Sequence, residues 1–191
     1  MRLYNAIGIA SFPPVLDFFV TFVFVLFSPL AAGASSLLHI FLIAFIFISV
    51  IPFIPTAYSV TKGLIDFNVT KKEQRTLFFL IAGGSYLIAA ALFFVLGSQI
   101  MLYLALSYAI IDFIVMLINL VWKISVHATI AGPITAIAYV FGWQYLILHI
   151  LTLVVMWSRI KLKVHNALQV MAGAVVSALI TFSVFYIFMP L

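Results

Sequence analysis

Long uncharged stretches separate a few small groups of charged residues in this chain, and this spacing constrains the fold more than any other feature. Of the 191 residues, 67% are hydrophobic and only 7% are charged, whereas about a quarter of a soluble domain is charged. A helix that crosses a bilayer needs about 20 consecutive apolar residues, and nearly the whole chain consists of such stretches. The sequence therefore predicts an all-α integral membrane protein, with residues 1–191 in a single membrane domain.

Turn residues divide the apolar stretches into a polytopic bundle of about six to seven transmembrane helices. We expect turns at residues 31–36, at Gly97 and Ser98, and at Gly142. The expected helices cover residues 12–31, 37–60, 77–96, 99–121, 126–141, 143–157 and 166–188. The fifth and sixth, at about 15 residues each, are too short for a full span.

Prolines indicate where these helices begin or bend. Pro13 and Pro14 suit the start of the first helix. Pro52 and Pro55 predict a break or kink near the end of the second helix, and Pro133 predicts a kink in the fifth. The beginning of the chain lacks the pattern of a cleavable signal peptide, so we expect the first apolar stretch to remain as a membrane helix.

The basic residues are predicted to lie on one face of the membrane. They are Arg2, then Lys62, Lys71, Lys72 and Arg75, then Lys123, and then Arg159, Lys161 and Lys163. An even number of expected helices separates each group from the next, so the groups can meet. The positive-inside rule alone also produces basic loops on one face. The positive-inside rule depends on the number of basic residues on each side of the membrane, and basic residues that bind phosphate alter this number. The sequence therefore leaves open which side of the membrane this face occupies.

The net charge of +5 does not indicate a nucleic-acid-binding protein. Such proteins carry an exposed basic face, whereas these bases lie in short loops between apolar helices. The expected partners are membrane lipids, either anionic headgroups or a lipid phosphate or diphosphate bound as substrate. We expect a multi-pass protein of the cell membrane, and nothing in the sequence indicates an oligomeric state.

Three segments on this face combine cations with serine or histidine. They contain Lys71, Lys72 and Arg75; Lys123, Ser125 and His127; and Ser158, Arg159 and His165. Basic side chains and helix N-terminal amides bind phosphoryl groups, and an imidazole beside them can act as nucleophile or general acid. Two other interpretations stay open: a helix-capping role for Ser125 and His127, and an interfacial loop at 158–165 that binds headgroups.

These segments resemble the three signatures of the phosphatidic acid phosphatase type 2 superfamily, over residues 71–173. The third signature, S-R-x5-H followed by glycine, is matched by Ser158, Arg159, His165 and Gly173. The second, P-S-G-H, keeps Ser125 and His127, with Ile124 and Val126 in place of proline and glycine. The first signature consists of a lysine, six residues of any type, and then Arg-Pro. This chain keeps its arginine as Arg75, but has Asn68 in place of the lysine and Thr76 in place of the proline. Lys71 or Lys72 would therefore have to serve as the lysine.

The resemblance implies a phosphatase-like core at about 61–189, an extra N-terminal helix pair at about 12–60, and a role for each site residue. His165 would attack phosphorus to form a phosphohistidine, and His127 would protonate the departing lipid oxygen. The phosphate oxygens would be held by Arg75, Arg159, Ser125, the Val126 amide and a lysine, Lys71, Lys72 or Lys123. The scheme requires neither a metal nor another cofactor.

One site residue departs from the family pattern. Gln169 stands where the family has the aspartate that orients and charges the nucleophilic histidine. Four residues apart on a helix, Gln169 can reach His165, but its amide supplies no negative charge. Asp66 and Asp112 are the other possible sources of that charge, from other parts of the chain. A catalytically inactive relative that binds lipid phosphate, or a subunit of a membrane complex, is therefore the alternative hypothesis.

Other polar and small residues give weaker indications. Asp112, near the middle of the fourth helix, is either functional or hydrogen-bonded to another helix, and Asp17 is expected at the interface. The glycines at 83, 84 and 173 favour close helix packing over chemistry. A transporter is less expected because the bases lie at one surface, and a prenyltransferase would need aspartate-rich metal sites.

Overall fold

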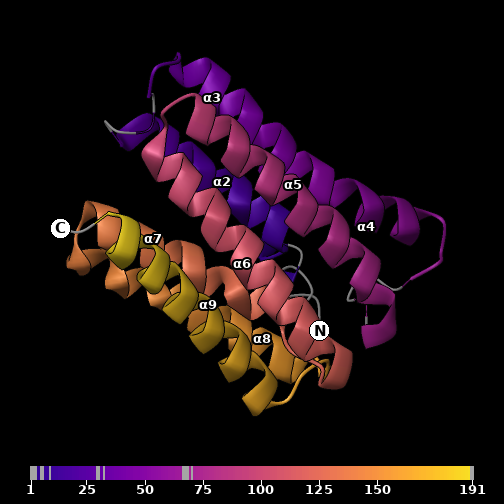
Figure 1. Ribbon diagram of the computed structural model, residues 1–191. Coiled ribbons are helices and arrows are strands. Elements are labelled where there is room, and N and C mark those ends of the chain that lie inside the picture. The colour runs from indigo at the N-terminus through magenta and orange to yellow at the C-terminus, as the bar shows by residue number, and fades with distance from the viewer. Residues whose placement is uncertain are drawn as a thin grey trace.

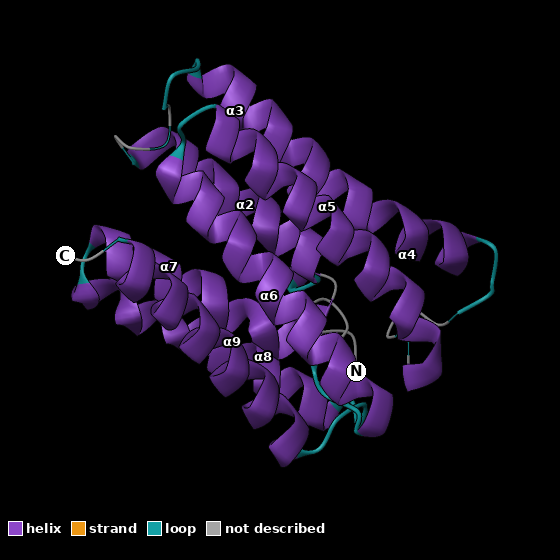
Figure 2. Ribbon diagram, viewed as in Figure 1, coloured by secondary structure: helices purple, strands orange, loops and turns teal. Residues whose placement is uncertain are grey.

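The computed structural model describes residues 4, 7, 8, 10–28, 31, 33–65, 69 and 71–189, except for the side chain of Lys72. Arg2, Asp66 and Asn68 lie outside the described residues. The described chain folds into helices that run back and forth in one bundle (Figure 1), and these helices account for all its regular structure (Figure 2). The α-helices are α2 (Pro13–Phe27), α3 (Leu37–Ala44), α4 (Ile51–Thr61), α5 (Thr76–Val95), α6 (Gln99–Val121), α7 (Ala131–Phe141), α8 (His149–Lys161) and α9 (Ala167–Phe188).

Tighter and wider turns extend several of these helices. A π-helical segment, Phe45–Val50, joins α3 to α4, and 3₁₀ turns precede α5 (Lys72–Arg75), α7 (Val126–Ile130) and α8 (Trp143–Leu148). The helices so extended include five that are long and apolar enough to cross a membrane: Leu37–Thr61, Glu73–Val95, Gln99–Val121, Trp143–Lys161 and Ala167–Phe188. Two shorter apolar helices, Pro13–Phe27 and Val126–Phe141, complete the bundle.

Two of the expected helix boundaries are wrong. The first helix ends at Phe27 instead of residue 31, because Pro29 follows and a residue before proline avoids helical backbone angles. The sixth helix continues past residue 157 to Lys161 and, with its 3₁₀ turn, reaches 19 residues. It is therefore not a short helix, and Ser158 and Arg159 lie in its last turn.

Pro52 and Pro133 lie at helix beginnings, whereas Pro55 lies inside α4. Pro52 is the second residue of α4, directly after the π-helical segment, and Pro55 lies one turn further on. Proline removes an amide donor, and a π turn is a common way to absorb a disturbed bonding pattern. Pro133 lies in the first turn of α7, where the 3₁₀ turn becomes an α-helix.

The core lies between α2, α3, α5, α6 and α9. Phe24, Ile40, Phe93, Leu104 and Phe185 contribute side chains with no exposed surface. Large apolar side chains are also exposed along the outside of the bundle, far beyond the few hundred Å² that soluble monomers expose in one patch. The outer surface is therefore suited to lipid.

Candidate functional site

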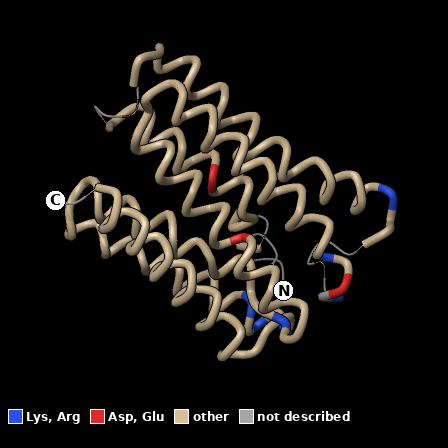
Figure 3. The backbone as a smooth tube through the Cα atoms, in the orientation of Figure 1, with Lys and Arg blue, Asp and Glu red and all other residues tan. Residues whose placement is uncertain are grey.

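The described lysines and arginines gather at one end of the bundle (Figure 3). At this end α4 ends and α5 begins, α6 leads into the 3₁₀ turn before α7, and α8 leads into α9. Helices that run out and back bring these three connections together, although up to about 90 residues separate them in sequence. The candidate site is built from these connections.

The connection between α8 and α9 places His165 close to Arg159. Arg159 is fully buried in the last turn of α8. Lys163 adopts a left-handed backbone conformation, with φ of 57°, and the amide of Val164 donates to the carbonyl of Arg159 at 3.3 Å. This is the helix-ending arrangement in which one left-handed residue satisfies the last carbonyls. It reverses the chain, and His165 follows at once.

Gln169 holds the ring of His165 through a contact that also begins α9. Asn166 and Gln169 form a capping box in which the Asn166 amide donates to Gln169 Oε1 at 3.1 Å, and the Gln169 amide donates to Asn166 Oδ1 at 3.0 Å. His165 Nδ1 lies 3.1 Å from the same Gln169 Oε1. A backbone amide can only donate, so this atom must be the carbonyl oxygen, and Nδ1 must carry the proton. His165 Nε2 is left with a lone pair.

The surroundings of His165 keep its ring neutral. Burial, together with the nearby charges of Arg75, Lys123 and Arg159, lowers the pKa of His165 from 6.5 to about 3, against the opposing effect of the Gln169 hydrogen bond. At neutral pH the ring is therefore an unprotonated base. A nucleophilic imidazole requires this protonation state.

The segment with Ser125 and His127 packs against the first turns of α9. The Ser125 amide donates to the carbonyl of Gln169 at 3.2 Å, and a side-chain carbon at Gly173 would overlap the Ser125 carbonyl oxygen. Gly173 is thus required for close packing, as expected. Ser125 begins the 3₁₀ turn without a side-chain capping bond. Ser125 Oγ and His127 Nε2 are buried, and neither has a hydrogen-bond partner within the described part of the chain.

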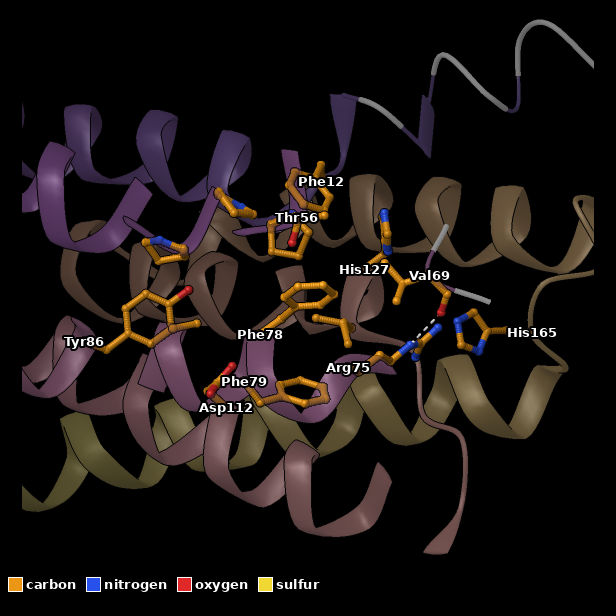
Figure 4. A pocket seen from close by; sticks show the side chains of 15 residues that line it. Phe12, Thr56, Val69, Arg75, Phe78, Phe79, Tyr86, Asp112, His127 and His165 are labelled. Atoms are coloured by element: carbon orange, nitrogen blue, oxygen red, sulfur yellow. Dashed lines mark hydrogen bonds between the residues drawn. The ribbon is translucent and has the colours of Figure 1, made fainter. Parts of the chain in front are cut away.

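Arg75 joins two of the connections. Its Nε donates to the carbonyl of Val69 at 2.8 Å and its Nη1 to the carbonyl of Ile124 at 3.1 Å. The guanidinium is buried between them. Because a buried cation needs such partners, these carbonyls fix the position of Arg75 beside His165 (Figure 4).

A cavity of about 100 Å³ opens between these groups. His127, His165 and Arg75 line one end, and Tyr86 and Asp112 line the other, with apolar side chains between them (Figure 4). Both imidazoles therefore face a single hollow, although they come from different connections.

The remaining predicted cations differ in position. Lys123 is half-buried, and its charge helps to lower the pKa of His165. Lys71 is exposed and does not line the cavity. The side chain of Lys72 lies outside the described atoms. Of the segment 71–75, the structure thus brings Arg75 to the histidines and leaves Lys71 apart.

Three described residues near the N-terminus, Tyr4, Gly8 and Phe12, lie against the site, which was not expected from the sequence. Ser158 Oγ donates to the carbonyl of Tyr4 at 3.0 Å, and the ring of Tyr4 lies 5.1 Å from that of Trp157. A side-chain carbon at Gly8 would lie 2.9 Å from Arg159 Nη1. The Phe12 ring lies 6.1 Å from that of His127. No local sequence pattern predicts these contacts, because they join residues that are far apart in the sequence.

Asp17 was also misplaced by the sequence analysis. It was expected at the interface, but it is buried within the bundle, where the hydroxyls of Tyr86 and Tyr108 face it. The helix α2 begins deep against the site, at Phe12, so its second turn already lies inside the protein. Asp112 lines the far end of the same cavity as the histidines, while the bond to His165 Nδ1 comes from Gln169.

Comparisons with known proteins add no family assignment. Neither the models of protein families nor the curated proteins nor the solved structures include a match to this chain. Among the described residues, no group of three or more histidine, aspartate or glutamate side chains is placed to hold a metal ion.

Proposed function

We propose that this chain is a multi-pass lipid phosphatase of the cell membrane, which hydrolyses a phosphomonoester or diphosphate of an isoprenoid or glycerolipid through a phosphohistidine. The observation that carries this proposal is the shared cavity of His127, His165 and Arg75, with Arg159 and Lys123 close enough to act on the imidazoles. In this proposal α2 and the helix Val126–Phe141 cross the membrane with the five longer helices, which gives the expected six to seven spans.

The chemistry follows from the protonation state of His165. Its Nε2 lone pair attacks phosphorus and forms the N–P bond while the P–O bond to the lipid breaks. The departing lipid oxygen takes a proton from His127, whose protonated form is favoured by the charge of the bound phosphate. Water then attacks the phosphohistidine and gives a proton to His127, which releases phosphate and restores both rings. Gln169 holds the Nδ1 proton throughout.

The cations supply the electrostatic part of catalysis. Negative charge spreads over the phosphate oxygens in the transition state, and fixed donors in a water-poor site stabilise it strongly. Arg75 and Arg159 are buried, and the hydroxyl of Ser125, which has no hydrogen-bond partner among the described residues, adds a neutral donor. The resemblance to the phosphatidic acid phosphatase type 2 superfamily supports the same roles.

The alternative is a catalytically inactive relative that binds lipid phosphate or serves in a membrane complex. The amide of Gln169 favours it, because the amide fixes the ring of His165 but adds no charge. Replacement of the analogous aspartate by asparagine in serine proteases lowers turnover by about 10⁴. The two candidates therefore differ in turnover and not in phosphate binding.

Phosphate release by the purified chain in detergent tests the proposal. We expect the parent to release phosphate from short-chain phosphatidic acid or farnesyl diphosphate in the presence of a chelator, and His165→Ala and His127→Ala to be inactive. Equal release by the parent and both variants would reveal a contaminant and reject the mechanism. Binding of phosphate without release from a broad set of lipids would support the inactive relative.

A further inference from the structure

The cavity has a second polar end that the proposed reaction does not use. Asp112 and Tyr86 line it opposite the histidines, and Phe78 and Phe79 lie between the two ends (Figure 4). The cavity volume of about 100 Å³ is room for about seven to ten water-sized groups, at roughly 10–15 Å³ each. An apolar passage with a polar group at each end suits an amphiphile that carries two polar groups.

The far end holds a polar atom without a partner. Asp112 Oδ2 is buried and has no hydrogen-bond partner within the described chain. A second cavity of about 50 Å³ lies beside the first, shares Tyr86, Asp112 and His127 with it, and is also lined by Asp17 and Tyr108. Burial of a carboxyl oxygen without a partner is unfavourable, so a bound hydrogen-bond donor at this end would be stabilising.

A glycine in α5 makes room for the Asp112 carboxyl. A side-chain carbon at Gly83 would lie 2.9 Å from Asp112 Oδ2 and 2.8 Å from Cζ of Phe113. The next residue, Gly84, has nothing within 4 Å of such a carbon. Space beside the carboxyl is therefore a specific property of position 83.

The rise of a helix gives an approximate length for the span between the two polar ends. Arg75 directly precedes α5, and Gly83, beside the Asp112 carboxyl, follows it by eight residues, which corresponds to about 12 Å at 1.5 Å per residue. Carbon–carbon bonds of about 1.5 Å advance an extended chain by about 1.25 Å each. About eight carbons thus separate a phosphate at Arg75 from a group at Asp112.

We infer that the site selects lipid phosphates whose chain carries a hydroxyl about eight carbons from the phosphate, with Asp112 as the residue that recognises this hydroxyl. The inference rests on the proposed function for the phosphate end only. The hydroxyl donates to the Asp112 carboxyl, whose Oδ2 has no partner within the described chain. A neutral donor is favoured over an ammonium group because desolvation of a charge is far more costly.

Binding of two phosphonates tests this inference without hydrolysis, since their P–C bond is not cleaved. 8-Hydroxyoctylphosphonate and nonylphosphonate have the same number of heavy atoms and differ only in the terminal group. By calorimetry on the full chain in detergent, we expect the hydroxyl compound to bind about tenfold more tightly, the effect of one good buried hydrogen bond.

Matched variants locate the effect. Gly83→Ala crowds the Asp112 carboxyl and Asp112→Ala removes it, so both should abolish the preference while nonylphosphonate still binds, which also shows that the variants are folded. Gly84→Ala is the control and should keep the full preference. Equal binding of the two phosphonates to the parent, or the same behaviour of Gly83→Ala and Gly84→Ala, would overturn the inference alone. Failure of both phosphonates to bind the parent would overturn the proposed phosphate site as well.

Discussion

At the residue scale, Gln169 has two functions that a single atom performs. Its Oε1 accepts from the Asn166 amide and from His165 Nδ1, so the start of α9 and the tautomer of the histidine depend on the same oxygen. Gln169→Asp is the simplest change that would place a carboxylate at this position. The structure favours Gln169→Glu instead, because aspartate is one carbon shorter and would not reach both partners.

We predict that Gln169→Glu raises phosphate release at least about tenfold, because the glutamate carboxylate keeps the capping box and adds the charge that stabilises a developing imidazolium. Gln169→Met is the comparison, since it has similar length but accepts neither bond. It should lower activity and lower the melting temperature, with a cost of about 0.5–2 kcal/mol for the lost cap. Equal activity of the two variants would contradict this role for the side-chain oxygen.

The lowered pKa of His165 also predicts how stability depends on pH. The pKa is about 3 in the folded chain and 6.5 in the absence of the fold. Between these values the unfolded chain binds a proton that the folded chain excludes, so stability present at neutral pH is lost as the pH falls from about 6.5 toward about 3. His165→Gln lacks this proton-binding group.

Melting temperatures of the parent and His165→Gln at pH 7 and at about pH 4.5 measure this effect. We expect the melting temperature of the parent to fall more between the two pH values than that of the variant. The difference between the two proteins is the useful quantity, since every other titrating group is common to both. Parallel curves would mean that the ring is already solvated and protonated normally.

At the scale of helices, apolar length and turn residues predicted most of the elements. The expected helices 77–96, 99–121 and 166–188 agree within one residue at each end with α5, α6 and α9, because glycine or polar residues border long apolar runs there. The expected sixth helix ended too early, at residue 157, because residues 158–161 include two basic residues, which are typical of a loop at the membrane surface. Of these two basic residues, Arg159 is buried whereas Lys161 is exposed, and only the tertiary fold reveals this difference.

The end of α8 gives a prediction with a matched control. Lys163 holds a left-handed conformation, φ of 57°, which costs a non-glycine residue about 1 kcal/mol. Lys163→Gly should therefore raise the melting temperature of the chain. Lys161→Gly removes the same charge, but Lys161 is the last residue of α8 and has no left-handed conformation to relieve; glycine there costs less than the roughly 1 kcal/mol of a helix interior and should lower the melting temperature slightly. Shifts of the same sign in both variants would contradict a left-handed turn at 163.

At the scale of the whole molecule, the candidate site divides into a part that local spacing predicts and a part that it does not. His165 and Gln169 are one helical turn apart, so their contact could be inferred from the sequence. The contact between Tyr4 and Ser158 spans 154 residues, and the burial of Asp17 depends on where α2 begins against other helices. The periodicity of apolar residues predicts neither the Tyr4–Ser158 contact nor the burial of Asp17, because both result from the packing of segments that are distant in the sequence.

The described N-terminal residues Tyr4 and Gly8 pack against Arg159 and its neighbours. Arg159 is fully buried, with Gly8 against its guanidinium and Tyr4 held on the neighbouring Ser158 and Trp157. These contacts contribute to the burial of Arg159. Weaker attachment of Tyr4 should make the arginine more accessible on average.

We predict that Tyr4→Ala increases the rate at which phenylglyoxal modifies Arg159, measured by mass spectrometry of the peptide that contains it, by about three- to tenfold, the effect of a ring contact worth about 0.5–1.5 kcal/mol. Tyr58→Ala is the control, because Tyr58 is 58% exposed and lies on α4; it should leave the rate unchanged. Saturating inorganic phosphate should slow the modification in both proteins. If phenylglyoxal modifies Arg159 no faster in Tyr4→Ala than in the parent, access to Arg159 does not depend on the packing of Tyr4. The phosphate would then have to enter from the lipid side, between α4 and α5.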